Sequence, residues 1–223
     1  MTEQIITNIF LALFVIDFLV HIYSEITENK KLRYATKPLL MPLLILYYIF
    51  GIGVMNVNWF IVLALIFSLG GDLSLMIGRE GKWFMYGLGS FLFGQISYII
   101  GFALTISNIF LFPSWGIILI MPEVVIAGSL YFLINDKMGK LKIPTVVYML
   151  VISTMSFFAL SRLGSYMGVA FLLVWLGSLS FIISDAIIAF DKFYKDIPKD
   201  RVYVMITYGL AQFLIVQGLL MSL

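Results

Sequence analysis

Long apolar stretches follow one another along nearly the whole chain, and no other feature of the sequence constrains its fold so strongly. A helix that crosses a membrane needs about 20 mostly apolar residues. Eight segments of that kind are present, near residues 5–23, 38–55, 58–78, 83–106, 114–134, 143–161, 165–190 and 203–221. Only 12% of the 223 residues are charged, whereas a soluble domain carries about 25%. We therefore predict an all-α fold, a polytopic membrane bundle of eight transmembrane helices.

The polar breaks between these segments are short, so we expect residues 1–223 to form a single transmembrane domain. The breaks are Ser24–Lys37, Asn56–Asn58, Gly78–Lys82, Ser107–Ser114, Asn135–Lys140, Arg162–Gly164 and Asp191–Arg201. No basic residue precedes the first apolar stretch and no small-residue cleavage site follows it. We expect that stretch to stay in the protein as its first helix and not to act as a signal peptide.

The distribution of basic residues predicts the orientation. Thirteen of the fourteen Lys and Arg residues lie in or beside the first, third, fifth and seventh breaks, and Arg162 alone lies in an even-numbered one. Cytoplasmic loops carry the excess of basic residues. The odd breaks are therefore predicted to face the cytoplasm, and the N and C termini to lie on the non-cytoplasmic side. Compactness and short loops favour a bacterial inner membrane.

A parallel internal repeat of helices 1–4 and 5–8 is one interpretation of the polar residues. Helices three and seven each carry an aspartate, Asp72 and Asp185, and helices four and eight each carry a central glutamine, Gln95 and Gln212. Coincidence among so few polar residues is an equally good explanation.

Composition excludes several classes of function. The chain has no cysteine and one histidine, so thiolate chemistry, disulfides and a multi-histidine zinc site within one chain are excluded. Phosphate-binding glycine loops and nucleophile-elbow motifs are absent from the sequence. A net charge of +2 gives no reason to expect nucleic-acid binding. If the protein is an enzyme, carboxylates are left to do acid–base chemistry. We expect no cofactor and no metal, although two or three carboxylates are able to hold a hard cation.

Asp72 and Asp185 are the first candidates for that chemistry. Each lies about six residues from the predicted cytoplasmic end of its helix, roughly 9 Å deep at 1.5 Å per residue. Ionisable groups at membrane depth are costly and are functional candidates. If both helices face one cavity, two close carboxyls favour a state with one protonated and one ionised, which suits acid–base catalysis. The alternative is that each aspartate only bonds neighbouring helices or pairs with Lys37.

Three more charged residues have two interpretations each. Asp17 either completes an acidic cluster or pairs with His21, one turn later on the first helix. Lys37 is predicted to open the second helix directly before Pro38, where proline is tolerated. It either binds a phosphate headgroup or lies at the interface as a topology signal. Glu123 follows Pro122 near mid-membrane, where it either donates to a backbone carbonyl freed by the proline, the interpretation we favour, or belongs to the site.

Neutral polar residues within the spans are candidates for lining a polar pocket or for interhelical hydrogen bonds. They are Gln95, Ser97, Tyr98, Tyr148, Tyr208 and Gln212.

The order and spacing of these residues resemble the YhhN-like family, whose characterised members are lysoplasmalogenases. The resemblance spans most of the chain. It rests on Thr36-Lys37-Pro38-Leu39, Phe67-Ser68-x-x-Gly71-Asp72-x-x-Leu75-Met76, Phe91-x-x-Gly94-Gln95-x-x-Tyr98, Ser184-Asp185 and Tyr208-x-x-Ala211-Gln212. One departure is that Gln95 stands where we expect histidine after the glycine of the fourth helix.

The resemblance implies hydrolysis of the vinyl ether bond of a lysophospholipid in the bilayer, giving a fatty aldehyde and a glycerophospho-base. The family's paired aspartates match Asp72 and Asp185, on the cytoplasmic side, and Lys37 is a candidate for holding the substrate phosphate. Two alternatives stay open: hydrolysis of another lysolipid or ether lipid, and transport of a small solute or proton. The sequence does not indicate the oligomeric state.

Overall fold

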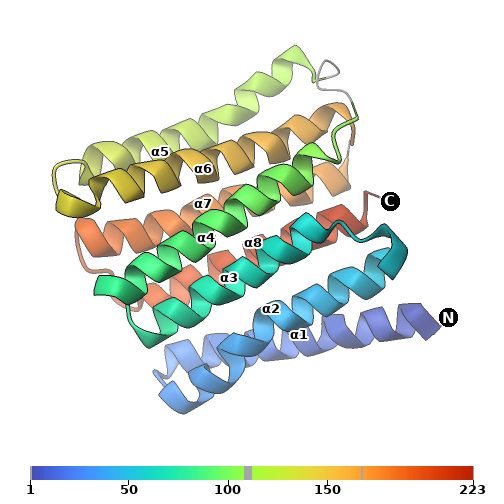
Figure 1. The fold of residues 1–223 in the computed structure, drawn as a ribbon, viewed down its shortest axis with the longest axis horizontal. Coiled ribbons are helices and arrows are strands. Elements are labelled where there is room, and N and C mark those ends of the chain that lie inside the picture. Colours follow the sequence, from blue (N-terminus) through green and yellow to red (C-terminus); the bar gives the residue numbers. More distant parts are fainter. Residues whose placement is uncertain (1, 108–111, 167, 223) are drawn as a thin grey trace. The chain divides into compact units, whose positions relative to one another are not determined.

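The computed structural model describes residues 2–107, 112–166 and 168–222, and over these ranges its regular elements are all helices joined by turns. Residues 108–111, part of the fourth predicted break, lie outside the described residues. The described ranges contain eight α-helices (Figure 1): α1 Thr2–Ile26, α2 Lys30–Ile52, α3 Trp59–Ile77, α4 Gly81–Ala103, α5 Met121–Ile134, α6 Lys142–Ser161, α7 Val169–Phe193 and α8 Asp200–Leu220. Eight spans are long and apolar enough to cross a membrane. Two of them, Ser114–Ile134 and Gly139–Gly164, consist of α5 and α6 with the 3-10 turns beside them. The predicted all-α fold with eight spanning segments is confirmed.

The second helix begins earlier than predicted, so the prediction of a long polar break over Ser24–Lys37 is wrong. α1 continues to Ile26, and α2 begins at Lys30, where the Asn29 side chain accepts a hydrogen bond of 3.1 Å from the Leu32 N–H. Lys37 and Pro38 therefore lie two turns inside α2. These first turns contain polar side chains that are buried rather than solvated, and this packing extends the helix beyond its apolar segment.

The fifth span is also different from the prediction. A 3-10 segment, Ser114–Ile120, precedes α5, and Pro122 stands in the first turn of α5. Proline is tolerated there because its missing N–H would have no partner within the helix. Pro122 therefore frees no carbonyl in mid-helix, and the role predicted for Glu123 is wrong. Glu123 instead has side-chain hydrogen bonds with Ser153 and Ser156 of α6.

The chain divides into two compact units, Met1–Gly101 and Phe102–Ser222. The first unit contains α1, α2, α3 and nearly all of α4. In it α2 packs against both α1 and α3. The side chain of Asn58 joins the start of α3 to the end of α4, because its Oδ1 accepts from the Phe60 N–H at 3.1 Å and its Nδ2 donates to the Gly101 carbonyl at 3.0 Å.

The second unit is organised around the pair α7 and α8. A Cβ added to Gly177 would lie 2.9 Å from the Ala211 carbonyl oxygen, and one added to Gly218 would lie 2.7 Å from that of Ala170. The two backbones thus approach each other directly at both glycines, as small residues allow in membrane helices. α5 and α6 both pack on α7.

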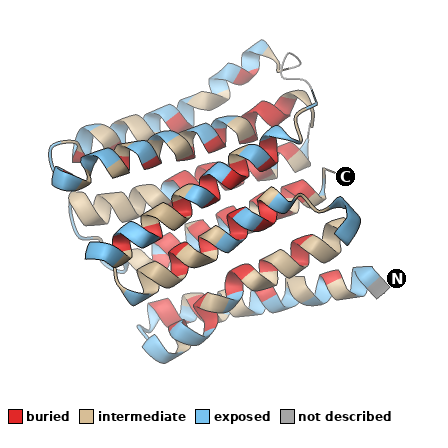
Figure 2. Cartoon of the chain, viewed as in Figure 1, coloured by how far each residue is buried: buried red, intermediate tan, exposed pale blue. Residues whose placement is uncertain are grey.

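Many residues of α1 and α5 are exposed (Figure 2), and among them are large apolar side chains. Phe132 on α5 is 84% exposed, and Ile16 and Leu19 on α1 are 59% and 62% exposed. Faces of this kind need an apolar solvent, and the bilayer core supplies one. Together with the eight spans, this makes the chain an integral membrane protein.

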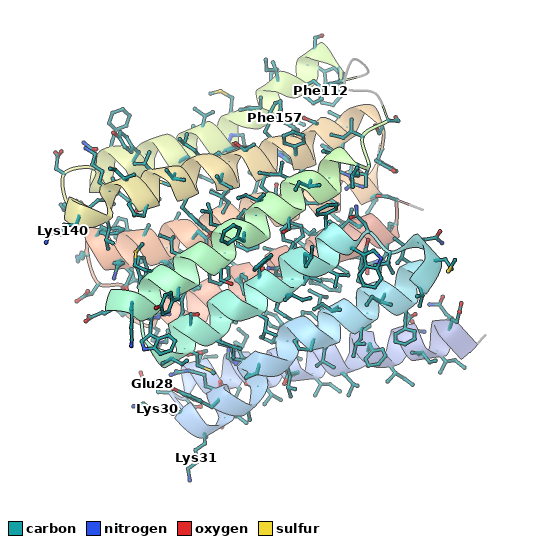
Figure 3. All side chains as sticks on the ribbon, viewed as in Figure 1. Glu28, Lys30, Lys31, Phe112, Lys140 and Phe157 are labelled. Atoms are coloured by element: carbon teal, nitrogen blue, oxygen red, sulfur yellow. The ribbon has the colours of Figure 1, made fainter. Side chains whose placement is uncertain are left out.

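Basic residues lie at the turns between helices. Figure 3 labels Lys30 and Lys31 at the α1–α2 turn and Lys140 at the α5–α6 turn. The side of the membrane that these turns face, and with it the orientation of the termini, stays a prediction.

Candidate functional site

Asp72 of α3 forms an ion pair with Lys37 of α2. The Lys37 Nζ lies 3.2 Å from Asp72 Oδ1, and the two residues are 9% and 2% exposed. A buried charge is tolerated when an opposite charge and hydrogen bonds accompany it. Of the alternatives open for Asp72, pairing with Lys37 is therefore what the structure contains. The displaced start of α2 is what places Lys37 inside a helix and opposite this carboxylate.

Small residues beside Asp72 let α4 approach α3 closely. A Cβ added to Gly71 would lie 2.5 Å from the Phe91 ring. One turn along, Ser90 Oγ donates a 2.6 Å hydrogen bond to the Phe67 carbonyl. α4 therefore packs directly on the α3 residues next to Asp72, which is itself almost completely removed from solvent.

A second polar cluster lies between α1 and α2. Arg33 binds Glu25 through two contacts, Nε to Oε1 at 2.8 Å and Nη2 to Oε2 at 2.6 Å. His21 Nδ1 lies 2.8 Å from Thr36 Oγ1, and His21 Nε2 lies 3.6 Å from Glu25 Oε1. All four side chains are buried. Sequence reasoning missed the Glu25–Arg33 pair because both residues were assigned to a loop. The four-residue spacing of His21 and Glu25 was the signal that α1 continues.

Asp17 does not pair with His21, which was one of the two predicted interpretations. His21 uses Thr36 and Glu25 instead. Asp17 lies on the same face of α1 as the buried Phe14, and its Oδ2 atom is buried with no hydrogen-bond partner among the described residues. His21 itself is completely buried.

Asp185 of α7 accepts a short hydrogen bond from Tyr148 of α6. Tyr148 is buried, while Asp185 is half-buried. The preceding residue, Ser184, donates to the Val204 carbonyl of α8 at 3.2 Å and ties this turn of α7 to its neighbour. Asp185 therefore has a fixed partner and a fixed helical support.

Tyr208 and Gln212, both on α8, are buried one turn apart. The Tyr208 ring packs edge-to-face on Phe181 of α7, with 5.4 Å between ring centroids. Both residues lie in the second unit, as Tyr148 and Asp185 do.

Gln95 and Tyr98 lie on α4 in the first unit. They are 1% and 0% exposed, and the Oε1 atom of Gln95 is buried without a hydrogen-bond partner among the described residues. The structure thus joins Lys37 with Asp72 in one unit and Tyr148 with Asp185 in the other. In the described part of the chain, no three His, Asp or Glu side chains are grouped to hold a metal ion.

Comparison with known proteins identifies relatives of this chain. The sequence is 30% identical over 160 residues to the protein named lysoplasmalogenase TMEM86A from Bos taurus, a match that covers 70% of this chain and 62% of that relative. The chain therefore spans less than two thirds of the length of that relative. No solved structure matches the chain.

The family profile matches a longer stretch. The profile of the YhhN family covers residues 32–219, which include both aspartates, Lys37 and Tyr148, while Asp17, His21 and Glu25 lie before it. Since this match extends over most of the sequence and contains both polar pairs described above, the chain belongs to the YhhN family.

Proposed function

We propose that the protein is a membrane-embedded hydrolase that cleaves the vinyl ether bond of lysoplasmalogens, giving a fatty aldehyde and a glycerophospho-base. Membership of the YhhN family and similarity to a relative named as a lysoplasmalogenase support this proposal. The observation that carries it is that Asp72 and Asp185 each have a defined polar partner inside the membrane spans, Lys37 for Asp72 and Tyr148 for Asp185.

The proposed reaction needs one acid and one base. The acid transfers a proton to the vinyl carbon that is β to the ether oxygen, and an oxocarbenium ion forms. The base accepts a proton from water as the water oxygen bonds to the carbon beside the ether oxygen. The resulting hemiacetal collapses to an aldehyde and a glycerol hydroxyl, so one water is consumed and nothing is oxidised or reduced. Carboxyl groups are suited to both roles.

We assign the base to Asp72, because its ion pair with Lys37 is the arrangement of an ionised carboxylate. An ionised carboxylate also stabilises a neighbouring oxocarbenium ion. The acid is then Asp185, with Tyr148 holding its carboxyl in position.

The other polar residues are proposed to bind the lipid. A lysine ammonium has three donors, so Lys37 can hold the phosphate of the substrate while it contacts Asp72. The remaining candidates from the sequence are proposed to contact the glycerol and the headgroup. These substrate-binding residues are Lys37, Asp17, Gln95, Tyr98, Tyr148, Tyr208 and Gln212.

The test is aldehyde release by the purified, detergent-solubilised protein. A choline lysoplasmalogen is compared with the lysolipid of the same chain length that carries a saturated ether. The proposal predicts aldehyde from the vinyl ether alone. In deuterated water it predicts one deuterium on the carbon next to the carbonyl, which marks protonation at carbon. No aldehyde from a folded protein would overturn the proposal and turn the search to another lysolipid.

A further inference from the structure

Gln95 has a buried hydrogen-bonding atom that lacks a partner in the part of the chain that the structure describes. The residue is 1% exposed, and its Oε1 atom has no hydrogen-bond partner among the described residues. Most buried polar side-chain atoms in proteins have a partner. An acceptor left unpaired inside a protein is costly, so such an atom points to a ligand that supplies a donor.

The register between α3 and α4 places Gln95 relative to Asp72. A Cβ added to Gly71 would meet the Phe91 ring, and a Cβ added to Gly94 would lie 3.5 Å from Ser68 Oγ. Residue 71 therefore stands opposite 91 and residue 68 opposite 94 on antiparallel helices. Gln95 lies about five residues beyond the level of Asp72, which is roughly 7.5 Å at 1.5 Å per residue.

Gln95 also shares a face of α4 with residues that line this packing. Phe91, Gln95 and Tyr98 are spaced by four and three residues, so they form one stripe of the helix, and all three are buried. Phe91 at one end of the stripe lies against Gly71, the residue before Asp72. The amide therefore follows, along one stripe of α4, from the Phe91 contact with α3, and it lies about one and a half turns along the helix axis from the level of Asp72.

We infer that the amide of Gln95 binds the central glycerol hydroxyl of the substrate and selects lipids that carry this hydroxyl free. The inference rests on the proposed function. A lysoplasmalogen has this hydroxyl on the carbon next to the one that bears the vinyl ether. The hydroxyl donates to Oε1, and the amide N–H₂ can donate to the hydroxyl oxygen.

The same contact rejects lipids that lack the donor. When the central position is acylated or deoxygenated, Oε1 stays buried and unpaired in the complex. Sites built to bond a substrate hydroxyl discriminate strongly against analogues without it, for this reason. Gln95 is thus a specificity-determining residue in this inference.

The experiment uses a matched pair of substrates and two variants. The pair is choline lysoplasmalogen and the same lipid with the central hydroxyl replaced by hydrogen. The unmodified protein is expected to prefer the hydroxyl lipid at least about tenfold in kcat/KM. Gln95→Met, which keeps an unbranched side chain but removes the amide, is expected to lose this preference. Gln95→Glu, which keeps an acceptor, is expected to retain it.

Each outcome decides the inference. Equal cleavage of the two lipids by the unmodified protein overturns the inference and leaves the proposed function standing. A preference for the hydroxyl lipid that survives in folded Gln95→Met has the same meaning. If Gln95→Met does not fold, a preference in the unmodified protein and in Gln95→Glu supports it. If neither lipid is cleaved, the proposed function fails. Binding of the saturated-ether lysolipid and its deoxy counterpart then decides: tighter binding of the hydroxyl form, lost in Gln95→Met, supports the inference, and equal binding overturns it.

Discussion

The ammonium of Lys37 and the carboxylate of Asp72 lie 3.2 Å apart between α2 and α3, and both side chains are buried. The sequence positions of the two residues differ by 35, so only the packing of the helices brings them together. The pair links the stability of the first unit to the chemistry proposed for Asp72.

The first prediction concerns this ion pair. Lys37→Met leaves the carboxylate of Asp72 buried without its cation, and removal of one partner of a buried pair costs about 3–5 kcal/mol. We expect a lower unfolding temperature in detergent and lower kcat for aldehyde release. The double variant Lys37→Met with Asp72→Asn removes both charges and should be more stable than Lys37→Met alone. If the losses of stability in Lys37→Met and Asp72→Asn simply added up in the double variant, the pairing would be contradicted.

A second prediction tests the support of Asp185. Tyr148→Phe removes the hydroxyl that donates to the carboxylate, while the ring keeps its packing. The net loss of one hydrogen bond is about 1 kcal/mol, so we expect nearly normal stability and about a tenfold fall in kcat. Tyr203→Phe, on the exposed face of α8, is the matched control and should keep full activity. Equal rates in both variants would remove Tyr148 from the mechanism.

The close contact of α7 and α8 gives a third prediction. Gly177→Ala places a Cβ 2.9 Å from the Ala211 carbonyl oxygen and 3.0 Å from the Ile215 nitrogen. Backbone atoms yield little, so we expect a loss of about 1–3 kcal/mol in thermal unfolding. Gly128→Ala on α5 meets nothing within 4 Å and should be neutral, or stabilising by up to about 1 kcal/mol. Two equally mild effects would show that the helices are further apart than described.

Orientation in the membrane is the fourth prediction, and a chain without cysteine suits its test. Three variants each carry a single cysteine at an exposed position. Met55→Cys lies at the second predicted break, whereas Lys31→Cys and Lys140→Cys lie at the first and fifth. In intact cells a membrane-impermeant maleimide should label Met55→Cys and leave Lys31→Cys and Lys140→Cys unlabelled until the membrane is opened. The reverse pattern would invert the predicted topology.

Hydropathy was enough to predict the eight spans, because a lipid environment imposes length and apolarity on every spanning helix. It was misleading where buried polar residues continue a helix. Arg33, Thr36 and Lys37 look like a solvated loop in the sequence, yet they belong to α2. Each has a buried polar partner on another helix, in the pairs Arg33–Glu25, Thr36–His21 and Lys37–Asp72. Partners that lie on other helices are not visible in a local pattern.

The sequence allowed the residues of the candidate site to be predicted better than the contacts between them. Intramembrane carboxylates are rare enough for Asp72 and Asp185 to stand out from the sequence alone. Their partners Lys37 and Tyr148 were named as binding residues, but the specific pairings depend on helix rotation and register. The same holds for Pro122, whose place in a first turn depends on the preceding 3-10 segment.

The most direct test of the central claim is aldehyde release from choline lysoplasmalogen by four purified proteins. They are the unmodified chain, Asp72→Asn, Asp185→Asn and, as a control, Asp196→Asn, whose side chain is exposed in the α7–α8 turn. The account predicts activity in the unmodified chain and in Asp196→Asn, and a loss of at least about 100-fold in both other variants with unfolding temperature retained. Full activity in folded Asp72→Asn or Asp185→Asn would contradict the assignment of acid–base catalysis to this pair.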